Sequence, residues 1–282
     1  MSTFIRYAKA ICFSIGWFIV FVMSQVFYTA FAFIFKIITD REYAISVQDL
    51  LQKATTGGAE QSANMLDAYI EIIGSLTSYL ELFLVIGMLG WFIIDRQFHE
   101  YRFAFNKVSL YDIPLFISLG ILMNILSTLF ISMFSADTIE STGYDTSLML
   151  QGGFVGVLLG VGIFAPVCEE ITFRYFIYHN LNRGNQILAI IISAALFGVA
   201  HGNILQGMYA FTFGLVFVLI NIRYNSIMPG IIMHISVNSL SVILMYITNP
   251  IVNLIVMVIC FIVISLIALV CKVCQRSIAN VE

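Results

Sequence analysis

The chain has 282 residues, of which 60% are hydrophobic and only 10% are charged, and its formal net charge is −3. Ordinary soluble domains carry about 25% charged residues, so these values exclude a soluble globular protein. The sequence also lacks a basic stretch, which argues against nucleic acid as a partner. We therefore expect the lipid bilayer to be the solvent of this protein.

Eight segments are apolar enough to cross a bilayer as helices, which takes about 20 residues each. They cover residues 10–35, 72–94, 113–134, 149–167, 187–203, 205–222, 227–247 and 251–271. The sequence thus predicts an all-α, polytopic membrane protein with about eight transmembrane helices. The longest polar segment, residues 39–71, follows the first of them, and we interpret it as an interfacial helix with a break at Gly57 and Gly58.

The distribution of lysine and arginine predicts how these helices are oriented, because cytoplasmic loops carry an excess of both residues. With the N-terminus in the cytoplasm, the inner segments contain Arg6, Lys9, Arg96, Arg102, Lys107, Arg174, Arg183, Arg223, Lys272 and Arg276, and the outer segments contain Lys36, Arg41 and Lys53. We therefore expect both termini to be cytoplasmic. Short loops and the lack of eukaryotic targeting signals favour the inner membrane of a bacterium.

Several polar side chains interrupt the apolar second half of the chain, where ionisable groups are costly and commonly functional. They are Glu169, Glu170, Arg174, His201, His234 and Asn238. Most fall at intervals of four residues, which puts two side chains on one helix face: Glu170 with Arg174, Phe197 with His201, and His234 with Asn238. An isolated Glu170–Arg174 pair would be a structural feature that neutralises itself.

Glu169 differs from Glu170 because neighbouring side chains on a helix point about 100° apart. The polar segment 179–186 predicts a turn between two antiparallel helices. Across this turn we expect Glu169 to face His201 at a similar depth, with His234 close to both. The sequence therefore predicts an intramembrane cavity shared by three helices, which we expect to be reached from the cytoplasmic side.

Two kinds of hydrolytic site could use these residues. In the first, a carboxylate removed from water acts as a general base, one histidine orients the water, and a second histidine and an amide donate to an oxyanion. In the second, a glutamate and two histidines hold a divalent metal such as zinc. The sequence contains neither Gly-x-Ser-x-Gly nor His-Glu-x-x-His, so it lacks the usual signatures of a serine hydrolase or a helical zinc protease.

EExxxR at Glu169, Glu170 and Arg174, FxxxH at Phe197 and His201, and HxxxN at His234 and Asn238 occur in this order. The three motifs together resemble those of the CAAX protease and bacteriocin-processing (CPBP, or Abi) family. The resemblance implies an intramembrane endopeptidase, commonly called a metalloprotease, that hydrolyses a membrane-associated protein or peptide. It divides the chain into N-terminal helices and an outer loop (1–148), a catalytic core (149–247), and a last helix with a short cytoplasmic tail (248–282).

The resemblance also implies roles for the individual residues. Glu169 would activate water, His201 would assist it or bind a metal, and His234 with Asn238 would form the oxyanion site. Glu170, Arg174 and Phe197 would support this geometry, and a metal would be held by Glu169, His201 and His234. Two other functions remain open: a non-catalytic scaffold or bacteriocin-immunity protein of the same fold, and a transporter that uses the acids and histidines as a proton relay.

Overall fold

The computed structural model describes residues 3–56, 86–87, 90, 106–142 and 153–279, and within these ranges it contains helices and no strands. The first part comprises α1 (Thr3–Thr39), α2 (Arg41–Thr56), the 3-10 turn η1 (Leu110–Asp112), α4 (Ile113–Ser132) and α5 (Ala136–Ser141). The second comprises α7 (Phe154–Val157), η2 (Leu158–Phe164), α8 (Ala165–Glu170), η3 (Ile171–Tyr178), α9 (His179–Asn182), α10 (Gln186–Ala200), α11 (Ile204–Tyr224), α12 (Met228–Met245) and α13 (Pro250–Ala279). The predicted all-α class is confirmed.

Six helical stretches among the described residues are long and apolar enough to cross a membrane: Ala8–Thr39, Leu110–Ser132, Phe154–Asn182, Ile204–Tyr224, Met228–Met245 and Pro250–Arg276. A seventh apolar helix, Gln186–Ala200, has only 15 residues. Seven of the eight predicted segments therefore have a helical counterpart, and the remaining one, 72–94, lies outside the described residues except for 86–87 and 90. The multi-pass architecture is confirmed, whereas the number eight and the orientation of the termini stay predictions.

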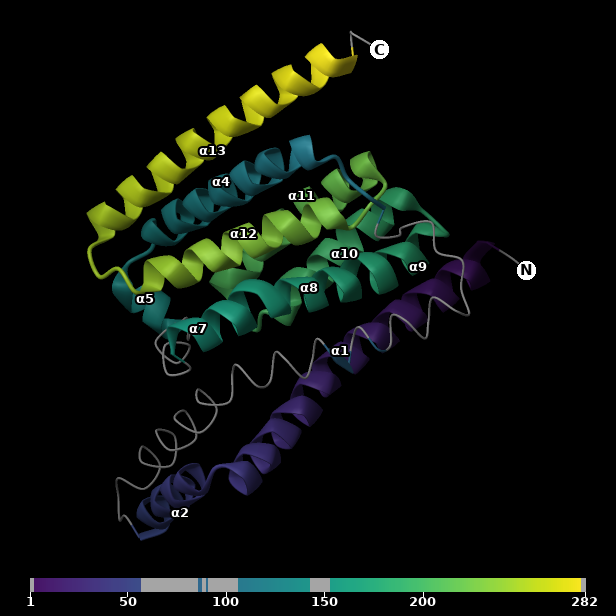
Figure 1. Cartoon of the computed structure of the whole chain (residues 1–282). Helices are drawn as coiled ribbons and strands as arrows, with labels where there is room; N and C mark the ends of the chain where they lie inside the picture. Colours follow the sequence, from purple (N-terminus) through teal and green to yellow (C-terminus); the bar gives the residue numbers. More distant parts are fainter. Residues whose placement is uncertain (1–2, 57–85, 88–89, 91–105, 143–152, 280–282) are drawn as a thin grey trace.

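Helix α12 occupies the centre of the bundle (Figure 1). It packs against α4 on one side, against η2 and α8 on the other, and against α11. Helix α13 covers the outer face of α4, and α1 lies against η3 and α9. The aromatic rings of Trp17 and Phe176 stack with centroids 4.0 Å apart and so join α1 to the core. The helix α2 is consistent with the predicted interfacial helix, although its predicted glycine break at 57–58 lies outside the described residues.

Small residues allow the central helices to approach closely, as is common in membrane bundles. A Cβ atom added to Gly120 of α4 would lie 2.5 Å from the carbonyl oxygen of Met233 on α12. One added to Gly198 of α10 would lie 2.7 Å from the carbonyl oxygen of Gly207 on α11. The backbones themselves therefore form the contacts between these pairs of helices.

The ends of the helices are fixed by polar contacts between segments far apart in the sequence. At one end, Lys272 of α13 pairs with Asp112 of η1, and the Ser226 hydroxyl donates to the Asn106 carbonyl over 2.8 Å. At the opposite end, the Asn203 amide donates to the carbonyl of Thr142 over 2.7 Å. These contacts define two ends of the bundle, one at the start of α4 and one at the turn between α10 and α11.

The stretch from Phe154 to Asn182 alternates between α-helix and π-helix. The segments η2 and η3 are π-helical, and the short α-helix α8 lies between them. Pro166 is near the first residue of α8, as expected of a residue that begins a helical section. Because π-helical turns often occur at functional sites, this pattern draws attention to Glu169 and Glu170, the last two residues of α8.

Candidate active site

Glu170 lies at the centre of a fully buried polar network. Its Oε2 atom is 3.4 Å from Nε of Arg174, and both side chains are almost completely excluded from solvent. This contact confirms the predicted pair at four-residue spacing. On its other side, the Arg174 guanidinium donates to the Ser193 hydroxyl over 3.2 Å and lies 4.9 Å above the ring of Phe197. The arginine thus links η3 to α10 while it neutralises Glu170.

Asn221 and Gly230 belong to the same network, and our sequence reasoning missed both of them. The Asn221 amide nitrogen donates to Oε2 of Glu170 over 3.4 Å, and its oxygen accepts from the backbone N–H of Gly230 over 2.8 Å. Asn221 therefore satisfies one of the free N–H groups at the start of α12, as a capping residue would. The sequence could have indicated Asn221, because its amide lies within the predicted transmembrane segment 205–222, where an unpaired polar side chain costs free energy.

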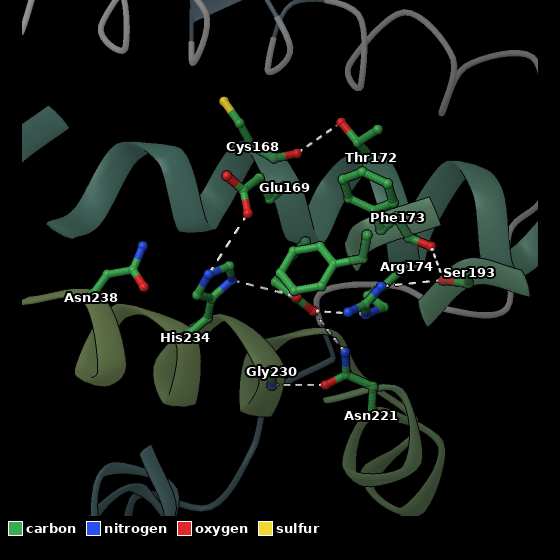
Figure 2. Close-up of polar contacts among 12 residues, drawn as sticks. Cys168, Glu169, Thr172, Phe173, Arg174, Ser193, Asn221, Gly230, His234 and Asn238 are labelled. Carbon is green, nitrogen blue, oxygen red and sulfur yellow. Dashed lines mark hydrogen bonds and ion pairs between the residues drawn. The ribbon is translucent and has the colours of Figure 1, made fainter. Parts of the chain in front are cut away.

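His234 lies between the two glutamates (Figure 2). Its Nε2 atom is 3.7 Å from Oε2 of Glu169, and its Nδ1 atom is 3.6 Å from Oε1 of Glu170. The imidazole stacks on the ring of Phe217 at a centroid distance of 5.0 Å, and the ring of Phe197 meets it edge-on at 5.5 Å. These aromatic contacts fix the plane of the imidazole, so that each nitrogen faces one carboxylate.

The two glutamates differ in their exposure. The Glu170 side chain is 0% exposed and that of Glu169 is 20% exposed. The Oε2 atom of Glu169 is buried beside His234 and has no hydrogen-bond partner, so the accessible part of this side chain lies on its other atoms. Glu169 thus has the access that Glu170 lacks, which agrees with the separation of the two residues expected from helix geometry.

His201 is held at the C-terminal end of α10. Its Nδ1 atom is 2.8 Å from the carbonyl oxygen of Phe197, and the two rings meet edge-on at 4.9 Å. Since a carbonyl can only accept, Nδ1 carries the hydrogen in this contact, and Nε2 is left available. The histidine that contacts Glu169 is His234, and the expectation that Glu169 also faces His201 stays a prediction. His201 directly follows the last residue of α10, at the turn to α11.

Asn238 lies one turn after His234 on α12, as Figure 2 shows. Its amide donates to the carbonyl oxygen of Val161 over 3.1 Å, and the neighbouring Ser239 hydroxyl donates to that of Gly162 over 3.1 Å. Both acceptors belong to the π-helical segment η2. The Asn238 amide has a second N–H group, which remains available to another acceptor.

A cavity of about 380 Å³ brings together the aromatic, imidazole and amide groups of the three motifs. Phe197, His201, His234 and Asn238 all line it. Glu169 does not line it directly and lies next to it, behind His234. The cavity continues past Gln206 and Ser241 to Thr142, Asn203 and Met245, which lie at the end of the bundle that contains the α10–α11 turn.

The cavity extends towards the end of the bundle that contains the α10–α11 turn, and access from the cytoplasmic side stays a prediction. The positive-inside count assigns residues 135–147 and the turns after α10 and α12 to the outer side, and the cavity reaches Thr142, Asn203 and the end of α12. The depth estimates from sequence used the opposite, cytoplasmic ends of the helices as their reference. They did not reveal that the cavity extends from His234 towards the α10–α11 turn, because this depends on how α4, α11 and α12 pack against one another.

The predicted metal ligands do not converge. Among the residues that the structure describes, no group of three His, Cys, Asp or Glu side chains is arranged to hold a metal ion. Glu169 and His234 face one another, but His201 directs its Nδ1 atom to its own helix and is not grouped with them. The side chains therefore do not fit the expected three-ligand zinc site.

Comparison with known families gives a match within the second half of the chain. The model of the type II CAAX prenyl endopeptidase Rce1-like family matches residues 151–240 of this chain. The matched range contains all three motifs, which confirms the resemblance predicted from them. Comparisons with curated proteins and with solved structures give no match.

Proposed function

We propose, from the match of residues 151–240 to the Rce1-like family, that this protein is an intramembrane endopeptidase whose Glu169 activates the attacking water. The observation that carries the proposal is the contact between Glu169 and His234 at the inner end of a cavity that also contains His201 and Asn238. A partly exposed carboxylate lies beside groups that can donate hydrogen bonds. A buried, purely structural ion pair would not need this access.

In the proposed mechanism, the Glu169 carboxylate accepts a proton from a water molecule as the water oxygen attacks the carbonyl carbon of the scissile peptide. The Nε2 atom of His201 accepts a hydrogen bond from the same water and orients it. The negative charge that develops on the carbonyl oxygen is stabilised by N–H groups of His234 and Asn238. Glu169 then returns the proton to the leaving amine as the C–N bond breaks, so that the carboxylate is regenerated.

The remaining network positions these groups. Glu170 holds His234 from the side opposite Glu169, and Arg174 balances the charge of Glu170. Asn221 joins Glu170 to the first turn of α12, which carries His234. Glu170, Arg174 and Asn221 are therefore positioning residues, whereas Glu169 touches the reacting water.

For the substrate, the family description points to prenylated CAAX proteins, which are membrane-associated. We infer that this protein also hydrolyses a membrane-associated protein or peptide, in the inner membrane of a bacterium. The apolar helices that surround the site support a substrate that reaches it from or near the bilayer. No observation on the described residues favours the alternative of a non-catalytic scaffold.

The proposal is tested by comparing the membrane and secreted peptides of host cells that produce the wild type, Glu169→Gln or Glu42→Gln. Glu42 is exposed on α2, far from the site, and provides the same chemical change as a control. We expect at least one peptide whose processing requires the wild type or Glu42→Gln and stops in Glu169→Gln. Identical peptide profiles in all three strains, with equal amounts of folded protein, would overturn the proposal.

A further inference from the structure

Ser193 of α10 is a fully buried serine whose hydroxyl group joins two other parts of the site, as Figure 2 shows. Its Oγ atom lies 2.8 Å from the carbonyl oxygen of Phe173 and 3.2 Å from Nη1 of Arg174. The direction of both hydrogen bonds is fixed, because a carbonyl oxygen only accepts and a guanidinium only donates. The single hydroxyl hydrogen therefore points to Phe173, and a lone pair of the oxygen faces Arg174.

The orientation of the Arg174 guanidinium depends on this hydroxyl group. Within the described part of the chain, Ser193 is the hydrogen-bond acceptor of Arg174, whose Nε and Nη2 atoms are buried and make no hydrogen bond. Nε is 3.4 Å from Oε2 of Glu170, a distance at which the two charges attract each other without a well-formed hydrogen bond. Because a hydrogen bond is directional whereas the attraction between two charges is not, the contact with Ser193 restrains the rotation of the guanidinium.

The position of Ser193 extends the four-residue spacing of the motif on α10 by one turn. Ser193, Phe197 and His201 follow one another at intervals of four residues, which places their side chains along one face of the helix and its C-terminal end. The Arg174 guanidinium meets two of them, because it donates to the Ser193 oxygen and lies 4.9 Å from the centre of the Phe197 ring. The Phe197 ring also contacts both histidines of the site. One face of α10 therefore holds Arg174 and reaches the cavity.

From Arg174, a line of polar contacts continues to Glu169. The Oε2 atom of Glu170 pairs with Arg174, and its Oε1 atom is 3.6 Å from Nδ1 of His234. The Nε2 atom of His234 is in turn 3.7 Å from Oε2 of Glu169. Protein interiors are close-packed, so a change at one group is felt by its neighbours. Displacement of the guanidinium would therefore shift the Glu170 carboxylate and the imidazole beside it.

We propose that Ser193 is a positioning residue, whose hydroxyl group fixes the guanidinium of Arg174 and, through the contacts above, the imidazole of His234. The reaction that it serves rests on the proposed function, whereas the contacts of Ser193 are independent of it. Ser193 is fully buried and does not line the cavity, so it acts through other residues and not on the substrate. Its loss should thus slow the chemical step and leave substrate binding almost unchanged.

The proposal is tested by steady-state cleavage of the peptide identified by the comparison of host strains, with equal amounts of folded wild type, Ser193→Ala, Ser193→Thr, Ser118→Ala and Glu169→Gln. Ser118 is the matched control, because it is a buried serine of α4 whose hydroxyl donates to the carbonyl oxygen of Leu115 over 2.9 Å, within its own helix. Ser193→Thr keeps the hydroxyl group. Ser193→Cys is close to serine in size, has only a weak donor and acceptor, and replaces Ser193→Ala should that variant not fold.

We expect Ser193→Ala to lower kcat about 10- to 100-fold, as a misplaced catalytic group does, and to change KM less than about twofold. Ser118→Ala should cleave like the wild type, and folded Ser193→Thr should recover most of the lost rate. Wild-type kcat in Ser193→Ala, a change confined to KM, or an equal loss in Ser118→Ala or folded Ser193→Thr would overturn the role of Ser193. The proposed protease would survive those results if Glu169→Gln were inactive in the same assay, whereas cleavage by Glu169→Gln at the wild-type rate would overturn both proposals.

Discussion

Gly230 is the position at which one added methyl group should disturb the site most. A Cβ atom there would lie 2.6 Å from Nδ2 of Asn221, 2.7 Å from Oε2 of Glu170 and 2.9 Å from Oδ1 of Asn221. These distances are too short, so in Gly230→Ala the two side chains must move and their hydrogen bonds must lengthen or break. Overpacking costs about 1–3 kcal/mol, and a buried polar group without its partner costs about 1–3 kcal/mol.

We therefore expect Gly230→Ala to lower the stability of the folded protein by about 2–4 kcal/mol, the lower part of the sum of both costs. Thermal unfolding of the protein purified in mild detergent measures this loss. Gly16→Ala is the matched control, because a Cβ atom at Gly16 has no neighbour within 4 Å. Asn221→Ala removes two of the three close contacts, so the double variant should be clearly more stable than the sum of the two single effects predicts.

The reasoning would be refuted by a Gly230→Ala protein as stable as Gly16→Ala. It would also be refuted by strictly additive losses in the double variant. Either result would mean that α12 can shift away from α8 and α11 without cost, in which case Asn221 would not position the helix that carries His234.

Three further predictions concern the charges, the oxyanion and the metal. Glu170→Gln should destabilise the protein by about 3–5 kcal/mol, because it leaves the Arg174 guanidinium buried without its charged partner. Thermal unfolding measures this loss, and a variant that unfolds at the same temperature as the wild type would contradict the prediction. In steady-state cleavage assays, Asn238→Ala should lower kcat about 100-fold with a small change in KM, as expected on loss of one oxyanion donor. An effect confined to KM would contradict this role and assign the amide to substrate binding. Chelators should leave the rate of cleavage unchanged, since Glu169, His201 and His234 do not form a three-ligand group, whereas inhibition reversed by added zinc would show that these residues regroup around a metal.

The sequence predicted the fold class and several local features of the site for clear physical reasons. Bilayer thickness sets the length of an apolar helix, and seven of the eight predicted segments have helical counterparts. The spacing of four residues predicted the contact between Glu170 and Arg174, which depends only on local helix geometry. The angle between neighbouring residues predicted that Glu169 and Glu170 would have different surroundings, and they differ in both exposure and partners.

Contacts between helices were predicted less well. The choice of His234 rather than His201 as the partner of Glu169 depends on how α12 packs against α8, which periodicity within one helix does not reveal. The close approach of Gly230 to Asn221 requires two helices to meet within van der Waals distance at one turn. The direction of the cavity depends on how α4, α10, α11 and α12, whose side chains line it, pack against one another. Each of these features depends on the relative rotation or tilt of helices, for which a single sequence contains no direct signal.

The central claim is that Glu169 activates the water that cleaves the substrate. The most direct measurement is single-turnover cleavage of the identified peptide by purified protein in liposomes, with wild type, Glu169→Gln and the control Glu42→Gln compared at equal amounts of folded protein. The account predicts that Glu169→Gln loses at least about 100-fold in rate, as expected on removal of a general base, and that Glu42→Gln cleaves like the wild type. Cleavage by Glu169→Gln within threefold of the wild-type rate would contradict the account.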